Sequence, residues 1–471
     1  MPDPSADPHG PHRPLDDPLG PPAASAPSPR PAAAPARLEV AHQTGADAPD
    51  ASPPEAVPEA AHAPFAALRH RGFLLYMLGA LLEALGGQVR LLTVGWDLYE
   101  RTGSALVLGN VGLVLALPVL LLAFPAGAAA DRFPRKVVMG AALAGQVACA
   151  LGLAWATRAH APLAVFYALL LGVGISSAFA RPASQALVPS LVPPEVFPNA
   201  AKWSSMRWQL GATAGPLVAG ALLALWQAPA RLYVVTAACS ATFALLLVFV
   251  TARPQERQRE AMTWAGALEG ARFVARQPLI LSTITLDMVA VLFGGATALL
   301  PVFAKDVLGG GPELLGLLRA APALGAVAMA LTLALRPPMR RAGRAMLVAV
   351  VVFGLATLAF GLSRSVPLSL GALVVLGAAD NVSVVVRSTL LQLLTPDAMR
   401  GRVSAVNAVF IGTSNEIGEW ESGTLAHGIG LVPTVLVGGL VTLASAAVAA
   451  RLWPGLVALG RLEDLRPPSD A

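Results

Sequence analysis

Residues 111–136 read VGLVLALPVLLLAFPAGAAADRFPRK, an apolar run from Val111 to Ala130 that ends in a charged segment. A bilayer core of about 30 Å needs roughly 20 apolar helical residues for one crossing, so this run is long enough to span a membrane. A transmembrane β-barrel would instead show alternating segments of about ten residues. We therefore expect a membrane-spanning helix that is followed by a charged loop.

Comparable runs continue to the end of the chain, and the composition agrees with them. Of 471 residues, 55% are hydrophobic and only 13% are charged, whereas a soluble domain carries charge on about a quarter of its positions. We expect an all-α membrane protein with twelve transmembrane helices. They are placed at 73–98, 106–130, 136–157, 162–180, 204–226, 231–252, 279–303, 313–335, 345–363, 367–386, 404–426 and 431–451.

Positive charges are distributed unequally between the two sets of predicted loops. Cytoplasmic loops of membrane proteins carry an excess of Lys and Arg, and this bias sets the orientation. With the amino terminus inside, the external loops hold only Arg101, Arg158, Arg231, Lys305 and Arg364, and the other loop cations fall on the cytoplasmic side. Both termini are therefore predicted to be cytoplasmic, in a multi-pass protein of the bacterial cytoplasmic (inner) membrane.

Two polar segments divide the chain. Residues 1–64 hold 17 of the 41 prolines and lack apolar periodicity, so we expect a disordered cytoplasmic tail. Residues 253–278 are expected to be a cytoplasmic linker between a six-helix half at 65–252 and a second at 279–455. Residues 456–471 are expected to be a cytoplasmic tail.

The two halves show weak internal similarity. Glu83 matches Asp287 and Pro118 matches Pro322 at an offset of 204 residues. Pro194-Glu195 also matches Pro396-Asp397, Gly211 matches Gly412, and Gly220 matches Gly423, at offsets of 201 to 203 residues. Such order and spacing indicate two six-helix repeats, an arrangement that places a substrate site between the halves near mid-membrane.

The loop that follows Val111–Ala130 carries a specific motif. Gly127, Asp131, Arg132, Arg135 and Lys136 fit the pattern G-x-x-x-D-R-x-x-R-[RK], which resembles the loop 2–3 signature of the major facilitator superfamily. The resemblance implies a gating role, in which this loop braces the outward-open state against the start of the helix at 404–426. The glycine is expected to permit close helix approach.

A second motif lies in the predicted fifth helix. Gly211, Gly215, Pro216 and Gly220 are similar to the G-P-x-x-G-G motif of antiporters, although Ala219 replaces one glycine. A proline removes one backbone hydrogen bond, so this segment is expected to bend. The stretches at 181–189, 387–392, 395–403 and 414–419 look like the branch that includes bacterial enterobactin exporters and drug efflux proteins. This resemblance implies proton-driven efflux of a small organic molecule, either siderophore or drug-like.

Charged residues within the predicted helices are candidates for proton coupling or for lining the cavity, because a mid-bilayer charge costs about 2.5–3.5 kcal/mol. Glu83 and Arg90 share one helix face. Asp287 is expected to be either a lone proton carrier or the structural partner of Arg90. A pairing of Asp380 with Arg387 would be structural. Glu416 and Glu419, three residues apart on one helix face, could serve proton coupling or contact a cation. The full set is Glu83, Arg90, Asp287, Asp380, Arg387, Glu416 and Glu419.

Other classes of protein find little support. Cys149 and Cys239 lie in separate apolar runs and the histidines are scattered, so neither a disulfide framework nor a metal site is expected. The chain shows no phosphate-binding loop and no catalytic set, so we expect no enzyme, no cofactor and no nucleic-acid partner. The expected partners are a small-molecule substrate, protons and the lipid bilayer, and the expected state is a monomer. A solute importer, a lysophospholipid transporter, and a non-transporting sensor or scaffold remain alternatives.

Overall fold

The computed structural model describes residues 64–462, except 254–263, 295 and 397–398. The chain divides into two units, Met1–Ala56 and Val57–Ala471. The first unit and the predicted tail at 1–64, apart from Pro64, lie outside the described residues. The fold below is that of the second unit.

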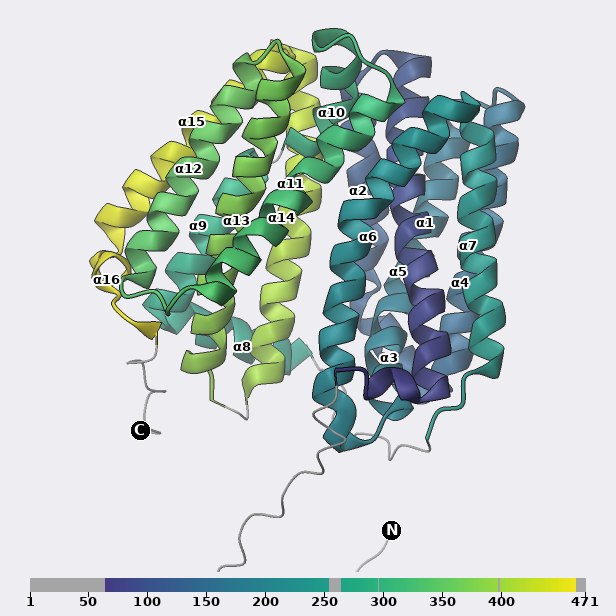
Figure 1. The fold of residues 1–471 in the computed structure, drawn as a ribbon, viewed down its shortest axis with the longest axis horizontal. Coiled ribbons are helices and arrows are strands. Elements are labelled where there is room, and N and C mark those ends of the chain that lie inside the picture. Colours follow the sequence, from purple (N-terminus) through teal and green to yellow (C-terminus); the bar gives the residue numbers. More distant parts are fainter. Residues whose placement is uncertain (1–63, 254–263, 295, 397–398, 463–471) are drawn as a thin grey trace, which may run out of the picture. The chain divides into compact units, whose positions relative to one another are not determined.

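Seven helices form the amino-terminal half, and the first of them is central to its packing. α1 packs against both α6 and α7, while α4 packs against α5 and α7 (Figure 1). The bounds are α1 Arg71–Thr102, α2 Ala105–Leu121, α3 Ala123–Arg132, α4 Arg135–Arg158, α5 Leu163–Leu187, α6 Phe197–Trp226 and α7 Pro229–Phe249.

The carboxy-terminal half repeats this arrangement after the linker helix α8 (Trp264–Arg276). α11 packs against α13, α12 packs against α13 and α15, and α9 packs against α14 and α15 (Figure 1). The bounds are α9 Pro278–Gly294, α10 Leu300–Val302, α11 Pro312–Leu335, α12 Ala342–Leu362, α13 Val366–Leu394, α14 Arg400–Ile429, α15 Leu431–Leu452 and α16 Pro454–Ala458. Short 3₁₀ segments precede α1 and α6 at Ala67–Arg69, Val188–Leu191 and Pro194–Val196.

One predicted helix is bent at a break, and another changes its helical type along its length. The helix expected at 106–130 bends by 51° between α2 and α3, where Pro118 and Pro125 flank Leu122 and each proline lacks the donor that a continuous helix needs. The helix expected at 279–303 ends at Gly294 and continues as the 3₁₀ helix η5 (Ala296–Leu299), α10 and the π-helix η6 (Phe303–Val307).

Ten described helices are long and apolar enough to cross a membrane, or eleven if the bent α2–α3 pair counts as one span. α14 coincides with the predicted segment 404–426 but does not belong to this set. Its 30 residues include Glu416, Glu419 and Glu421, and these acids lower its mean hydropathy. The count of twelve therefore stays a prediction.

Large apolar side chains cover the outside of the helices. Leu335 is 86% exposed, and Leu225, Val248, Phe249 and Trp155 are also exposed. Water would make such a surface unfavourable, whereas lipid chains solvate it at no cost. The exposed side chains thus support the membrane assignment independently of helix length.

The halves meet at the end of the helices opposite α8. α6 packs against α11, and α2 packs against α14. Beside these crossings, Tyr99 donates a hydrogen bond to Asp306, and Lys305 Nζ lies 2.6 Å from Glu100 Oε1. A cluster that includes Leu92, Leu223, Leu300, Phe303 and Leu315 also joins residues of the two halves. This end of the interface is therefore closed by apolar contact and by two polar links.

Candidate functional site

A cavity of about 640 Å³ lies between the halves. Its walls come from α1, α2, α3 and α5 on one side and from α14 on the other, and Ala271 of the linker helix α8 contributes at one end. Ala405 and Glu419 both line it, and these residues are about 21 Å apart along a helix that rises 1.5 Å per residue. The cavity thus runs from the α8 side to the middle of the bundle.

The lining is mostly apolar and contains a small polar set. Leu91, Val94, Leu115, Phe124 and Phe410 are among its apolar members. The polar and charged members are Arg90, Ser177, Arg181, Gln185, Glu416 and Glu419. A large apolar surface with a few placed polar groups is typical of sites for small organic molecules.

A second cavity of about 350 Å³ lies between α6 and the carboxy-terminal half. Its lining includes Gln209, Thr297, Asp380, Asn415 and Glu419. Glu419 lines both cavities. The carboxylate of this residue therefore stands at the junction of the two spaces.

Glu83 and Arg90, which sequence reasoning placed on one face of the first helix, are electrostatic neighbours in α1. The Glu83 carboxylate accepts a hydrogen bond of 2.6 Å from Ser240 Oγ of α7. Arg90 lines the larger cavity, and its buried Nη1 has no hydrogen-bond partner among the described residues. Only Arg90 of this pair lines the cavity.

Glu416 and Glu419 both line the larger cavity, as their spacing on one helix face predicted. Each has an arginine as an electrostatic neighbour, Arg181 for Glu416 and Arg319 for Glu419. Thr297 is a further polar neighbour of Glu419. The two acids are thus near positive charge without being in direct ion pairs within the described chain.

Asp287 is buried, and it is not the lone carboxylate that the sequence indicated. Arg387 of α13 forms an ion pair with it, and Ser383 Oγ donates a hydrogen bond of 3.0 Å to Asp287 Oδ1. The alternative partner named from the sequence, Arg90, lies in the other half. The direct ion pair of Arg387 in the described chain is with Asp287, whereas Asp380, the partner expected from the sequence, is an electrostatic neighbour of Arg387.

Asp380 lies close to the Asp287–Arg387 pair and interacts with both electrostatically. It also lines the second cavity, together with Glu419. The structure therefore brings Asp287, Arg387 and Asp380 into one cluster, and Asp380 is the member of that cluster that reaches the space between the halves.

The loop 2–3 motif makes its contacts within the amino-terminal half. Arg135 Nη1 donates to the Ala186 carbonyl at 2.8 Å, and Lys136 Nζ donates to the Val250 carbonyl at 2.5 Å. Asp131 and Arg132 are exposed, and the Asp131 side chain makes no hydrogen bond or ion pair with described residues. Within the described residues, Asp131 therefore does not make the predicted contact with α14.

The expected role of Gly127 in close helix packing is not seen, because a Cβ built on it would meet no atom within 4 Å. At the start of α14, Arg402 instead pairs with the linker helix, with its Nη1 at 2.5 Å from Glu269 Oε2. The linker helix therefore occupies a position at α14 that the resemblance assigned to loop 2–3.

The glycine motif of α6 lies in one unbroken helix of 30 residues that includes Pro216. The bend expected at this proline therefore does not interrupt the helix. Its glycines serve close packing. Gly211 faces Ala84 and Gly215 faces Gln88, both of α1, and Gly220 faces Gly316 of α11. The motif therefore joins α6 to its own half and to the opposite one.

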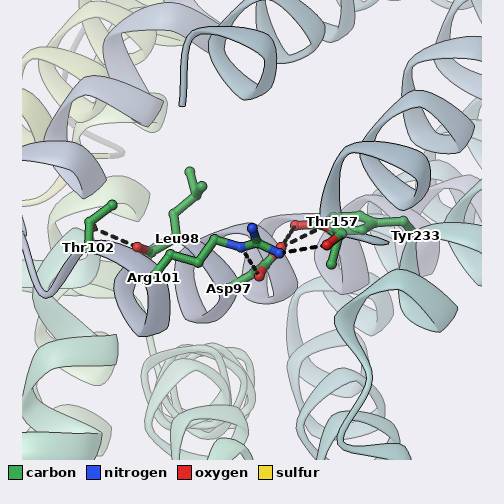
Figure 2. A network of polar contacts seen from close by, with 6 residues as sticks. All are labelled: Asp97, Leu98, Arg101, Thr102, Thr157 and Tyr233. Atoms are coloured by element: carbon green, nitrogen blue, oxygen red, sulfur yellow. Dashed lines mark hydrogen bonds and ion pairs between the residues drawn. The ribbon is translucent and has the colours of Figure 1, made fainter. Parts of the chain in front are cut away.

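A buried polar network lies at the carboxy-terminal end of α1, near Thr102 (Figure 2). Asp97 is 3% exposed. It accepts hydrogen bonds from Arg101 Nε at 2.7 Å, Thr157 Oγ1 at 2.9 Å and Tyr233 Oη at 3.3 Å. These partners belong to α1, α4 and α7, so this network ties three helices of the first half together and has a structural role.

The sequence analysis did not name Ser240, Gln185 or Thr297 as site residues. Arg181 and Gln185 entered it only as members of the stretch 181–189, and Arg181 also as a cytoplasmic loop charge. Arg181 and Gln185 are four residues apart, and both line the larger cavity. A polar pair at this spacing on an otherwise apolar helix face is a signal that could have found them. No spacing could have found Ser240, which meets Glu83 across 157 residues.

No group of three or more His, Cys, Asp or Glu side chains that could hold a metal ion occurs in the described part of the chain.

Residues 62–457 match the family described as transmembrane secretion effector, within the major facilitator superfamily. The chain belongs to this family. The enterobactin exporter EntS of Citrobacter koseri is 28% identical over 403 residues, which cover 83% of this chain and 90% of that protein. The multidrug efflux pump Tap of Mycolicibacterium fortuitum is 25% identical over 395 residues, covering 80% and 95%.

Solved structures of major facilitator transporters share the fold. A bacterial homologue of the lysosomal transporter Spinster, inward-facing and unoccupied, matches with a TM-score of 0.65 at 18% identity and covers 85% of this chain and 99% of its own. A D-xylose–proton symporter matches with a TM-score of 0.61 at 15% identity, covering 80% and 96%. The major facilitator fold and the prediction of an efflux-type, multi-pass transporter are thereby confirmed. These relatives and matched structures are transporters, not enzymes.

Proposed function

We propose that this protein exports a small organic molecule across the bacterial cytoplasmic membrane in exchange for protons, by alternating access. The observation that carries the proposal is the asymmetry of the interface between the halves. The larger cavity reaches from the middle of the bundle toward the α8 side, while the opposite end is closed by the α2–α14 and α6–α11 crossings.

The conformation fits an inward-facing state if α8 lies in the cytoplasm, as the charge distribution predicts. Asp131 has no hydrogen-bond or ion-pair partner among the described residues, which agrees with a loop 2–3 contact that forms only in the outward-facing state. The inward-facing Spinster homologue has the same fold. Reporter fusions after Arg158 and Arg364 should indicate the outside and fusions after Arg344 the inside, and a reversed result would reverse this assignment.

The Asp287–Arg387–Asp380 cluster is the proposed site of proton coupling. A buried ion pair is held by the charge of both members, so a proton on Asp287 would release Arg387. Asp380 and Glu419 line one cavity, which gives the cluster a link to the cargo space. Glu83, at the equivalent position of the first half, is the proposed second carrier.

Efflux is favoured because the named relatives are exporters, one of enterobactin and one of multiple drugs. A cavity of about 640 Å³ is within the usual size of sites for drug-sized ligands. Proteoliposomes with an imposed pH gradient, loaded with enterobactin or a panel of fluorescent drugs, test the proposal. Export that follows the sign of the gradient supports it, whereas gradient-driven movement only in the uptake direction would contradict it.

A further inference from the structure

Arg90 lines the larger cavity, and one nitrogen of its guanidinium group is left without a hydrogen-bond partner by the described helices. Its Nη1 is buried, yet no hydrogen-bond partner for it occurs among the described residues. The nearby acid Glu83 interacts with Arg90 electrostatically, but it accepts its hydrogen bond from Ser240 at 2.6 Å and makes no ion pair with Arg90 within the described chain. Leaving a charged donor buried without an acceptor is costly, so the site is suited to a ligand that brings one.

The two acids of the α14 wall, Glu416 and Glu419, do not need a cationic ligand to balance their charge. Glu416 has Arg181 as its positive neighbour and Glu419 has Arg319. A cationic ligand would have to compete with these arginines. An acceptor group at Arg90 would share the arginine with its electrostatic neighbour Glu83, but it would displace no hydrogen bond of Arg90 Nη1 within the described chain. The polar balance of the cavity therefore favours a negatively charged group at its inner end.

The apolar part of the cavity wall indicates the chemistry of the ligand beyond its acidic group. Leu91, Val94, Leu115 and Phe410 line the same cavity as Arg90, and they offer apolar contact to a hydrocarbon or aromatic body. The planar fork of arginine fits a carboxylate with two parallel hydrogen bonds.

We propose that the cavity selects amphipathic organic anions, with the acidic group bound by Arg90 and the apolar body packed between α1–α2 and α14. This inference rests on the proposed transport function, because it assigns the chemical class of the cargo. It makes Arg90 the residue that determines specificity, separate from the Asp287 cluster that drives transport.

Two fluorescent probes of nearly equal size test the charge requirement. Dansylglycine carries a carboxylate, and dansylglycinamide replaces it by a neutral amide. The full-length protein in nanodiscs should bind the acid roughly tenfold more tightly than the amide, as expected for one charge-assisted contact. Arg90→Gln should bring the two affinities within a factor of about two and leave amide binding unchanged.

The control is Arg231→Gln, which removes an exposed arginine at the start of α7 and should keep the tenfold preference. If Arg90→Gln does not fold, Arg90→Lys provides the comparison. It keeps the charge but not the fork, and it should lose part of the preference. Equal binding of both probes by the unmodified protein, or a preference unaffected by either Arg90 variant, overturns the inference.

Failure of this inference can be told from failure of the transport proposal. If proteoliposomes export ethidium along a pH gradient while neither probe discriminates, transport stands and the anion preference is wrong. If dansylglycine binds through Arg90 but no tested compound moves in response to the gradient, the binding site stands and coupled export is wrong.

Discussion

Gly220 of α6 and Gly316 of α11 meet backbone to backbone across the two halves. A Cβ added to Gly220 would lie 2.9 Å from the Cα of Gly316, closer than real Cβ atoms approach. Gly109 of α2 and Gly423 of α14 make a corresponding contact, where a Cβ added to Gly423 would lie 2.7 Å from the Cα of Gly109. Gly220 and Gly423 are also matched by the internal repeat, so the two crossings are related by the pseudo-symmetry of the halves.

A bulky residue at either crossing should open the closed end. Gly316→Leu or Gly423→Leu inserts a side chain where backbones touch, so the halves must separate there and the population should shift toward the other conformation. Labelling of a cysteine at Val94, which lines the cavity, by an impermeant thiol reagent added outside should rise several-fold.

The matched control for this experiment is Gly371→Leu, because a Cβ at Gly371 of α13 meets no atom within 4 Å. Its labelling should equal that of the parent protein. Equal labelling of the crossing variants and of this control would show that the glycine contacts do not hold the closed end.

The polar network at Asp97 should contribute to stability and not to transport chemistry. Asp97→Asn weakens the hydrogen bonds from Arg101, Thr157 and Tyr233, and bonds to a charged group contribute about 1.5–3 kcal/mol each. We expect a clearly lower midpoint of thermal unfolding in detergent, with unchanged cargo affinity in the protein that remains folded. A loss of affinity at full stability would place Asp97 in the site.

The sequence was sufficient for the all-helical membrane fold because the length of an apolar run is a local property. It was insufficient for partners, since Asp287 meets Arg387 and Glu83 meets Ser240 over 100 and 157 residues. The internal repeat correctly related Glu83 to Asp287 in position, but α7 supplies the partner of one and α13 the partner of the other. Repeats therefore conserve the placement of helices more closely than the side chains between them.

Helix breaks were also beyond the sequence analysis. Pro118 lies within α2 without ending it, and the break comes four residues later at Leu122. Pro216 lies in an unbroken α6. Whether a proline bends a helix depends on what packs around it, and that information is held in the other helices.

Asp131 should matter only in the conformation that this structure does not show. Asp131→Asn removes no hydrogen bond or ion pair with the described residues, so it should leave the thermal stability of this conformation unchanged. If the loop braces the outward-facing state, labelling from outside should fall and export should slow. Glu195→Gln, an exposed acid on the same side of the bundle, should change neither, and an identical result for Asp131→Asn would remove the gating assignment.

The strongest test of proton coupling is the substitution of Asp287, the proposed proton carrier. The membrane potential contributes about 2.3 kcal/mol per charge per 100 mV only when charge moves, so a transporter that cannot protonate its carrier loses the driving force but not its binding site. Asp287→Asn should abolish uphill export under a pH gradient and retain downhill exchange of bound cargo. Glu83→Gln should reduce uphill export in part.

Asp287→Asn alone leaves Arg387 buried without its counter-ion, which costs about 3–5 kcal/mol and could prevent folding. The double variant Asp287→Asn with Arg387→Gln removes both charges, so it should restore thermal stability toward that of the parent protein. If the pair were only structural, this variant would regain uphill export together with stability. If Asp287 carries the proton, the variant will exchange cargo downhill at the parent rate and still fail to export against a gradient. Recovery of uphill export would make Glu416 and Glu419, which line the cargo cavity, the next carriers to test.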